Sequence, residues 1–185
     1  MLLYGLSLSL LWIILYGLQA NLRYERSLIF QGELWRLFTA HLVHLNLTHL
    51  VLNLVGWWLF LKLCGHLLKP KQLSYYILSL ALGISLLLLI FQPHLQWYLG
   101  FSGVLYGLLL IGSIQLSLQP ERGLGLALIS LISLKFAWDS YNSLIHGSSL
   151  SSAQLIGAPV VLAAHGYGLL IGVILSLPAV YKNFK

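Results

Sequence analysis

The chain has 185 residues, of which 59% are hydrophobic and only 8% are Asp, Glu, Lys or Arg. Soluble domains carry about 25% charged residues, so roughly two thirds of the charge that a soluble surface needs is missing here. The mean hydropathy of +0.89 agrees with this deficit. The composition excludes a soluble globular protein and predicts a protein with several membrane-spanning segments.

The formal net charge is +6, which in a soluble chain would suggest a nucleic-acid partner. Here the basic residues stand singly between apolar runs, and the preference of Lys and Arg for the cytoplasmic side of a membrane explains them. We therefore expect no nucleic-acid partner. Cys64 is the single cysteine, which excludes an intramolecular disulfide and a metal site built from several cysteines.

Six apolar segments are long enough to be transmembrane helices, and we expect them to form one membrane domain over residues 1–185. A helix rises about 1.5 Å per residue and needs roughly 20 residues to cross the hydrocarbon core. None of the segments alternates like a barrel strand, so the predicted fold class is an all-α bundle of six transmembrane helices. A Ser/Gly/Asn-rich loop is expected from Ser140 to Ser152. The expected spans are about 2–20, 44–64, 72–91, 101–118, 123–141 and 157–178.

Lys and Arg are divided unevenly between the two sides of this bundle. With six spans, both termini lie on one side, where six basic residues face a single acid, Glu121. On the other side, four basic residues are offset by three acids. The excess of positive charge places both termini in the cytoplasm. The first side carries Lys62, Lys69, Lys71, Arg122, Lys182 and Lys185, and the second carries Arg23, Arg26, Arg36 and Lys135 with Glu25, Glu33 and Asp139.

The scarcity of acids limits the chemistry that is available at membrane depth. No acidic residue lies near the centre of a span, so a protease with two aspartates that share a proton is excluded. The His-Glu-x-x-His pattern of zinc proteases does not occur. A proton or sodium carrier would lack its usual buried carboxylate. The polar groups that remain available for chemistry at membrane depth are hydroxyl, imidazole and amide groups.

The first polar cluster lies at the start of the second expected span and contains His41, His44, His49 and Asn53. His49 and Asn53 are four residues apart, so they share one helix face and could donate hydrogen bonds together. The alternative is a hydrogen bond between neighbouring helices, a common role for His and Asn in membranes. A metal site built from the three histidines would have no supporting carboxylate.

The second cluster is Gly100-Phe101-Ser102-Gly103, at the point where the polar segment 92–100 becomes a helix. A serine at a helix N-terminus lies near unpaired backbone N–H groups, which favour a developing oxyanion. Gly103 and Gly107 are four residues apart and would allow another helix to approach closely. The alternative is a packing serine, because serine is common in membrane helices.

The third cluster contains His165, Gly168 and Gly172, which share one helix face. The imidazole is therefore expected to face a neighbouring helix, where it either has a structural role or acts as a general base for a serine hydroxyl. Together the three clusters supply a nucleophile, a base and oxyanion donors, the groups that acyl transfer needs. With no third triad member, this would be a Ser–His dyad.

These motifs resemble those of the rhomboid family of intramembrane serine proteases, in the same order and across all six spans. The resemblance implies that Ser102 is the nucleophile and His165 the general base, with the oxyanion held by His49, Asn53 and the Ser102 N–H. The matching residues are Glu33-x-Trp35-Arg36, His44, His49-x-x-x-Asn53, Gly100-x-Ser102-Gly103, Tyr106 and Ala164-His165-x-x-Gly168.

The resemblance also implies supporting roles and an activity. Tyr106 would pack against the His165 ring, His44 would take a structural hydrogen-bonding position, and Trp35 and Arg36 would belong to a membrane-dipping first loop. The implied reaction is hydrolysis of a peptide bond in or near a substrate's transmembrane helix, at a site that opens to the extracytoplasmic side. It uses no metal and no cofactor. The first loop departs from the family, because it has only about 20 residues between the expected spans.

Within the family the chain is most similar to the rhombosortases of bacteria. That similarity implies substrates that end in a Gly-Gly motif, a transmembrane helix and a basic cluster, with a membrane lipid as an acceptor for the new C-terminus. It also implies a location in the bacterial inner membrane, with the site open to the periplasm. The supporting stretches are Gly32-Glu-Leu-Trp-Arg-Leu, Lys135-Phe-Ala-Trp-Asp139, Gly157-Ala-Pro-Val-Val and Ala163-Ala-His-Gly-Tyr-Gly.

Two alternatives to this assignment remain: a general rhomboid protease with other single-span substrates, and a membrane transporter without enzymatic activity. Lys135 and Asp139, four residues apart, also have two interpretations. They form an ion pair at the membrane surface, with the lysine extended towards water, or they help to recognise a segment of small residues in the substrate.

Overall fold

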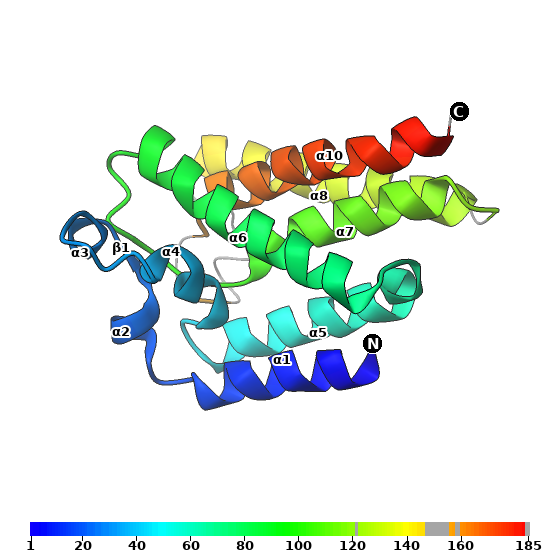
Figure 1. Ribbon diagram of the computed structural model, residues 1–185. Coiled ribbons are helices and arrows are strands. Elements are labelled where there is room, and N and C mark those ends of the chain that lie inside the picture. Colours follow the sequence, from blue (N-terminus) through cyan, green and yellow to red (C-terminus); the bar gives the residue numbers. More distant parts are fainter. Residues whose placement is uncertain (121, 147–155, 158–159, 184–185) are drawn as a thin grey trace.

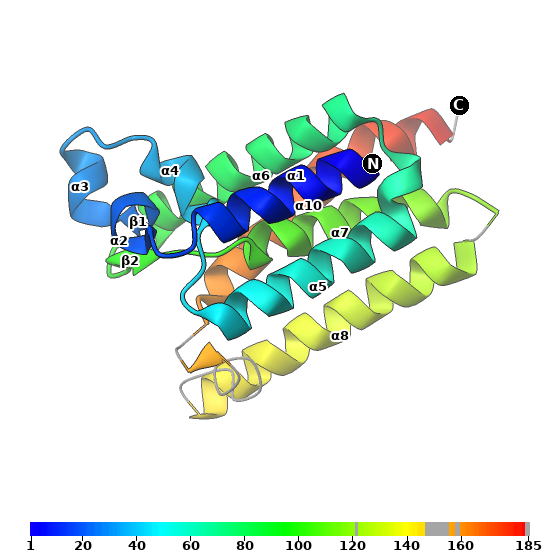
Figure 2. The same cartoon turned by 90° about the horizontal axis from the view of Figure 1, so that it is seen from below.

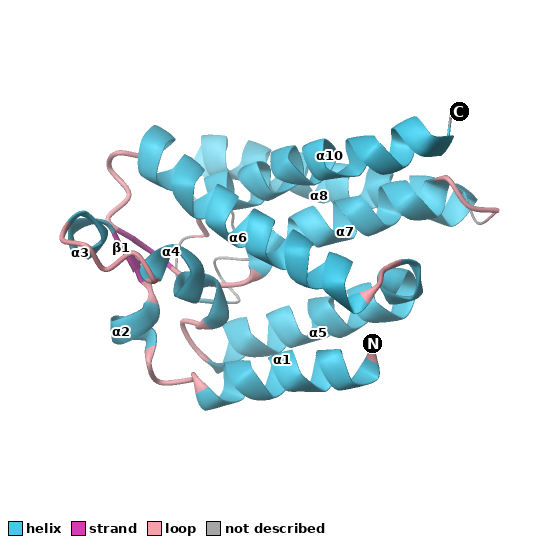
Figure 3. Ribbon diagram, in the orientation of Figure 1, coloured by secondary structure: helices cyan, strands magenta, loops and turns pink. Residues whose placement is uncertain are grey.

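The computed structural model describes every residue except 121, 147–155, 158–159 and 184–185 (Figure 1). The described chain is helical almost throughout, as Figure 3 shows, which confirms the predicted all-α class. Four helices are long and apolar enough to cross a membrane, and two more apolar helices are shorter. The long four are α5 (Leu47–Cys64), α6 (Pro70–Phe91), α8 (Arg122–His146) and α10 (Leu162–Asn183), and the shorter two are α1 (Leu2–Ile14) and α7 (Ser102–Ser117).

Helix α7 runs through the middle of the bundle, and α8 lies at its edge (Figures 1 and 2). Helices α5, α6, α8 and α10 all contact α7. Most residues of α7 are buried, including Val104, Leu108 and Ile111. Because α7 faces protein on all sides, the residue at which it begins is enclosed by several other helices.

Helices α7 and α10 touch backbone to backbone. A Cβ atom added to Gly168 would lie 2.1 Å from the Gly103 carbonyl oxygen, and one added to Gly107 would lie 2.8 Å from the Gly168 carbonyl oxygen. A Cβ atom on Gly172 would lie 2.9 Å from the Gly107 carbonyl oxygen. The expected close approach at these glycines is therefore present, and α10 is the helix that uses it.

Two helix ends near the N-terminus differ from the expected spans. Helix α1 ends at Ile14 rather than near residue 20, and Gly17, with a φ of 103°, turns the chain away after it. Helix α5 begins at Leu47 rather than at residue 44, because the Asn46 side chain caps it by accepting a hydrogen bond from the His49 N–H at 2.9 Å. His44 therefore precedes the helix.

Helix α8 extends beyond its expected end and includes the first part of the predicted Ser140–Ser152 loop. The Ser140 hydroxyl donates to the Phe136 carbonyl at 2.8 Å, and Asn142 Nδ2 donates to the Trp138 carbonyl at 2.8 Å. These polar side chains bond back to their own helix instead of ending it. The remainder of the predicted loop, residues 147–152, lies outside the described residues. Helix α10 begins at Leu162 and passes through Pro178 to Asn183, about five residues later than expected at each end.

The segment between α1 and α5 covers residues 15–46, more than the expected 20 residues, and consists of short elements. One of them pairs with the chain just before α7: β1 and β2 are antiparallel, with Tyr24 opposite Tyr98 and Glu25 opposite Trp97. The first loop is thereby joined to the segment that leads into Ser102. The short elements of this segment are α2 (Gln19–Leu22), β1 (Tyr24–Glu25), α3 (Arg26–Phe30), α4 (Arg36–Thr39) and η1 (Ala40–Leu42). Two more lie elsewhere in the chain: η2 (Gly65–Leu67) after α5 and β2 (Trp97–Tyr98) before α7.

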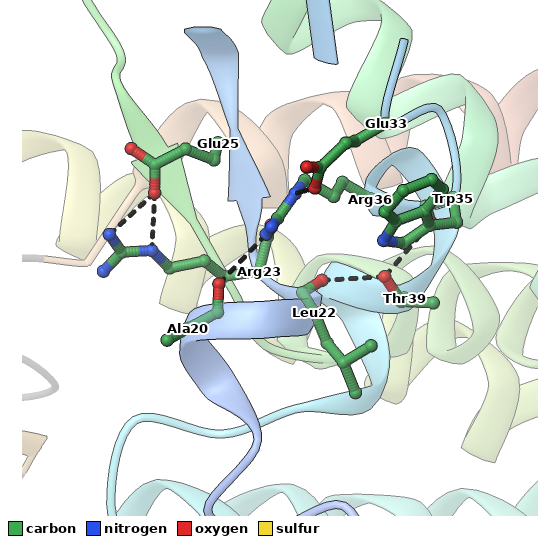
Figure 4. A network of polar contacts seen from close by, with 8 residues as sticks. All are labelled: Ala20, Leu22, Arg23, Glu25, Glu33, Trp35, Arg36 and Thr39. Atoms are coloured by element: carbon green, nitrogen blue, oxygen red, sulfur yellow. Dashed lines mark hydrogen bonds and ion pairs between the residues drawn. The ribbon is translucent and has the colours of Figure 1, made fainter. Parts of the chain in front are cut away.

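The Arg36 side chain holds this first loop together (Figure 4). Its Nε donates to Glu33 Oε2 at 2.6 Å, and its Nη1 donates to the carbonyl oxygens of Ala20 at 3.1 Å and Arg23 at 2.9 Å. The guanidinium is buried, so it satisfies carbonyl groups that water does not reach. Trp35, the neighbouring residue of the same motif, is 53% exposed. Arg36 therefore ties the loop internally, while Trp35 faces outward.

Replacement of Gly168 by Ala is expected to destabilise the fold, because the new methyl group would overlap the Gly103 carbonyl. The expected loss is about 1–3 kcal/mol, as for other overpacked cores. Cys64 is fully buried, so its reaction with a fluorescent maleimide during heating measures unfolding. Gly123→Ala on α8 is the matched control, since no atom lies within 4 Å of its added Cβ, and it should melt at or above the wild-type temperature.

Replacement of Arg36 by Met is expected to destabilise the first loop. The Ala20 and Arg23 carbonyls would lose their donor, at a cost of about 1–3 kcal/mol for each one that stays buried. The same Cys64 assay measures the loss, with the exposed Arg122→Met as the control. Equal melting temperatures for the Arg36 variant and the wild type would contradict this role.

Candidate active site

Ser102 and His165 lie in direct contact although 63 residues separate them. The Ser102 Oγ is 2.9 Å from the His165 Nε2. Ser102 is the first residue of α7, and His165 lies in the first turn of α10, one turn before Gly168. The backbone contact at Gly168 and Gly103 therefore sets the distance between the hydroxyl and the imidazole.

Tyr106 provides a flat surface for the imidazole. It lies one turn after Ser102, and its ring stacks on that of His165 with centroids 4.4 Å apart and an interplanar angle of 15°. The His165 Nδ1 is buried and has no hydrogen-bond partner among the described residues. The stacked ring, rather than a hydrogen bond at Nδ1, holds the imidazole in orientation.

Gly100 makes room for the His49 ring. A Cβ atom on Gly100 would lie 2.6 Å from His49 Cε1, and the Gly100 φ of 119° also disfavours any side chain. Two hydrogen bonds hold this turn: the Gly100 N–H donates to the Ala40 carbonyl at 2.9 Å, and the Tyr98 hydroxyl donates to the Gly100 carbonyl at 2.9 Å. The first glycine of the Gly-x-Ser-Gly motif thus brings His49 close to Ser102.

Asn53 lies one turn after His49 on the same face of α5. Its Nδ2 donates to the His49 carbonyl at 2.9 Å, and its Oδ1 is buried without a hydrogen-bond partner among the described residues. A carboxamide nitrogen carries two hydrogens, so the bond to His49 leaves one donor for another acceptor. The amide is therefore anchored and still able to donate.

One cavity of about 680 Å³ joins these groups. Ser102, His165, His49, Asn53 and Tyr106 all line it. Most of the remaining wall is apolar, which lowers the local dielectric constant and strengthens hydrogen bonds made inside. Four of the residues that the sequence analysis assigned to catalysis, from three helices, thus face one space. Lys135 lines the same cavity.

Two histidines near the site are buried and uncharged. Burial lowers the pKa of His41 to about 4 and that of His44 to about 3, so both rings are neutral at pH 7. His41 Nε2 lies 3.0 Å from Ser85 Oγ on α6. The expected structural hydrogen bond of His44 is not present among the described residues: both ring nitrogens lack a partner, and the ring packs instead against Trp12 and His49.

Other site residues predicted from sequence lie outside the cavity wall. Trp35 and Arg36 belong to the first loop, and Asp139 is buried beside the site, where it pairs with Lys135 as the spacing predicted. Among the described residues, no group of three or more His, Cys, Asp or Glu side chains is arranged to hold a metal ion.

Sequence reasoning missed the wall formed by residues 94–99, including Trp97 and Tyr98, which line the cavity. Aromatic residues next to a polar turn were the available signal, since they favour short strands. Asn46 was also missed: it caps α5, and its Nδ2 donates to the carbonyl of Ile156, a residue that lines the cavity, at 2.6 Å.

The comparisons with known proteins agree with this geometry. A family model described as the Rhomboid domain matches residues 31–182. The rhomboid protease GlpG of Enterobacter sp. (strain 638) is 27% identical over 153 residues, which cover 79% of this chain and 49% of that protein. The rhomboid protease GlpG of Klebsiella pneumoniae, in strains MGH 78578 and 342, is 34% identical over 122 residues, 62% of this chain and 42% of those proteins.

The chain spans about half the length or less of these curated relatives. The Rhomboid domain match, however, covers most of its residues and includes Ser102, His165, His49 and Asn53. Together with the apolar helices, it identifies a membrane protein with several spans. The chain belongs to the rhomboid family.

Proposed function

We propose that this protein is an intramembrane serine endopeptidase that uses a Ser–His dyad. The observation that carries the proposal is the 2.9 Å contact between Ser102 Oγ and His165 Nε2 inside a largely apolar cavity. The relatives that share the domain are named rhomboid proteases, which supports the same activity. The single membrane domain of residues 1–185 is part of this proposal.

The first half of the reaction forms an acyl-enzyme. Ser102 Oγ attacks the carbonyl carbon of the scissile bond while His165 Nε2 takes the hydroxyl proton. This requires the neutral imidazole with its hydrogen on Nδ1. The proton then passes from Nε2 to the leaving nitrogen, and the C–N bond breaks. Water, or another nucleophile, attacks the ester in the second half with His165 again as the base.

The negative oxygen of the tetrahedral intermediate needs donors within hydrogen-bond reach. We assign this role to the His49 ring, the second Nδ2 hydrogen of Asn53 and the Ser102 backbone N–H at the start of α7. All three come from neutral groups. Their placement by helices and by the Gly100 turn means that little reorganisation is needed when charge develops.

The substrate class is the finer part of the proposal. We assign the protein to the rhombosortases, with exported proteins that carry a C-terminal Gly-Gly motif and a transmembrane anchor as substrates. A membrane lipid that bears an amine would serve as acceptor in place of water. Cleavage of other single-span proteins is the alternative.

We further propose an orientation in the bacterial inner membrane. Met1 and the C-terminal end of α10 lie at one end of the bundle, and the first loop and β2 lie at the other (Figures 1 and 2). The end that carries the termini also has the excess of Lys and Arg, which places it in the cytoplasm. The first loop and the cavity mouth then face the periplasm.

The proposed nucleophile is tested by covalent labelling. Purified protein should react with a fluorescent serine-directed phosphonate, and Ser102→Ala should abolish the signal, because the attacking oxygen is removed. Ser113→Ala is the matched control, since this buried serine of α7 bonds to the Leu109 carbonyl of its own helix. Labelling that persists in Ser102→Ala refutes the assignment, and solute flux in liposomes that survives the same change would favour a transporter.

The substrate class is tested by cleavage and mass spectrometry. A reporter that ends in a Gly-Gly motif, an apolar helix and a basic cluster should be cut near the glycines, and replacement of both glycines by valine should reduce the rate at least about tenfold, the effect of steric rejection in a tight pocket. The mass of the new C-terminus separates a free carboxylate from a lipid adduct. Equal cleavage of the valine reporter would favour a general rhomboid protease.

A further inference from the structure

Helix α8 carries a buried carboxylate beside the dyad that the mechanism above does not use. Asp139 is 1% exposed and accepts a hydrogen bond from Lys135 Nζ, one turn earlier on the same helix. Lys135 in turn lines the cavity with Ser102 and His165. A carboxylate inside a membrane protein is costly to bury, so its presence here calls for a reason beyond surface pairing.

One oxygen of this carboxylate is not used by Lys135. Asp139 Oδ1 is buried and has no hydrogen-bond partner among the described residues. The Tyr106 hydroxyl is close enough for the Asp139 carboxylate to act on it by charge and by hydrogen bonding. Among the described residues, Oδ1 therefore remains an open acceptor near the Tyr106 hydroxyl.

Tyr106 is held between two rings, one from each neighbouring helix. It stacks on His165 at 4.4 Å and meets the edge of Phe136 of α8 with centroids 6.5 Å apart. Phe136 lies three residues before Asp139, so the two share one face of α8. The same face fits against α10, because a Cβ atom on Gly166 would lie 3.2 Å from the Phe136 ring. Helix α8 thus presents an aromatic ring and a carboxylate to Tyr106.

The dyad depends on Tyr106 for more than packing. In a Ser–His–Asp triad a carboxylate holds the second imidazole nitrogen, but His165 Nδ1 has no such partner in the described chain. The orientation of the imidazole therefore relies on its stacking against Tyr106. Any group that restricts the Tyr106 ring therefore also restricts the orientation of the His165 imidazole.

We propose that Asp139 is a positioning residue for His165 that acts through Tyr106. The carboxylate, oriented by Lys135, accepts the Tyr106 hydroxyl proton in a hydrogen bond and holds the ring parallel to the imidazole. When His165 takes the Ser102 proton, this ring faces an imidazolium, and the face of an aromatic ring attracts a cation. A phenol that donates to a carboxylate is polarised towards negative charge, which strengthens this attraction.

This role differs from recognition of the substrate. Asp139 is too deeply buried to touch a peptide in the cavity, whereas Lys135 is partly exposed to it. A small phosphonate that reacts with Ser102 makes few of the contacts of a transmembrane substrate. Its rate of reaction therefore reports the state of the dyad, while cleavage of a full substrate reports both the dyad and recognition.

The test rests on the proposed function and measures the rate of phosphonate labelling at Ser102 in purified protein. Asp139→Leu, which removes both carboxylate oxygens, should slow labelling by about tenfold or more, the scale of loss when the group that orients a functional imidazole is removed. Tyr106→Phe, which keeps the ring and removes one oxygen, should slow it similarly. The variant that carries both changes should be labelled no more slowly than the slower of the two single variants. Each change alone already breaks the series of contacts from Asp139 through Tyr106 to His165.

Asn142→Leu is the matched control on the same helix, because Asn142 is buried and, among the described residues, its side chain bonds to the Trp138 carbonyl of α8 itself. It should label within twofold of the wild type. Maleimide reaction at Cys64 confirms that each variant is folded. If Asp139→Leu unfolds at the assay temperature, the comparison with Tyr106→Phe uses Asp139→Asn instead, which keeps the shape of the Asp139 side chain and removes its charge.

The positioning role of Asp139 would be overturned if a folded Asp139 variant were labelled at the wild-type rate. It would also be overturned if the fold-reduction in labelling rate of the double variant equalled the product of the two single reductions. Loss of substrate cleavage with normal labelling would likewise overturn it and assign Asp139 to recognition. Failure of the proposed function looks different, because the wild-type protein itself would then not be labelled at Ser102.

Discussion

The rest of the site depends on the backbone contact between α7 and α10. Gly103 and Gly107 on one helix face Gly168 and Gly172 on the other, with no space for a side chain between them. In a membrane, helices gain nothing from burying apolar surface against each other rather than against lipid, so close packing of small residues has to hold them together. That contact begins one residue after Ser102 and one turn after His165. The packing that stabilises the bundle therefore also sets the distance between the hydroxyl and the imidazole.

The second constraint is the shortage of charge at depth. The proposed catalytic groups that line the cavity are a hydroxyl, two imidazoles and an amide, with Tyr106 stacked on His165 and Lys135 elsewhere in the same wall. The nearby histidines His41 and His44 are neutral because burial lowers their pKa. Asp139, a buried carboxylate of α8, is paired with Lys135. A set of uncharged proposed catalytic groups beside a paired charge suits a membrane interior, where an unpaired charge is costly.

Much of this arrangement could be predicted from sequence, because it follows from local spacing. The shared face of His49 and Asn53 and that of His165 and Gly168 depend only on helix geometry. Other features depend on tertiary contacts that spacing does not reveal. The start of α5 is set by the Asn46 side chain, and α8 continues past Ser140 because polar side chains there bond back to their own helix. The pairing of Tyr24 with Tyr98 and the burial of Asp139 required the relative positions of distant segments.

The separation of 63 residues between Ser102 and His165 has a consequence for biosynthesis. Chains are made from the N-terminus, so Ser102, His49, Asn53 and the first loop enter the membrane before His165 is synthesised. Until α10 is inserted, the glycine face of α7 lacks its contact with Gly168 and Gly172, and the Ser102 hydroxyl lacks the imidazole beside it. Docking of α10 on α7 therefore forms the glycine packing and the Ser102–His165 contact in the same step.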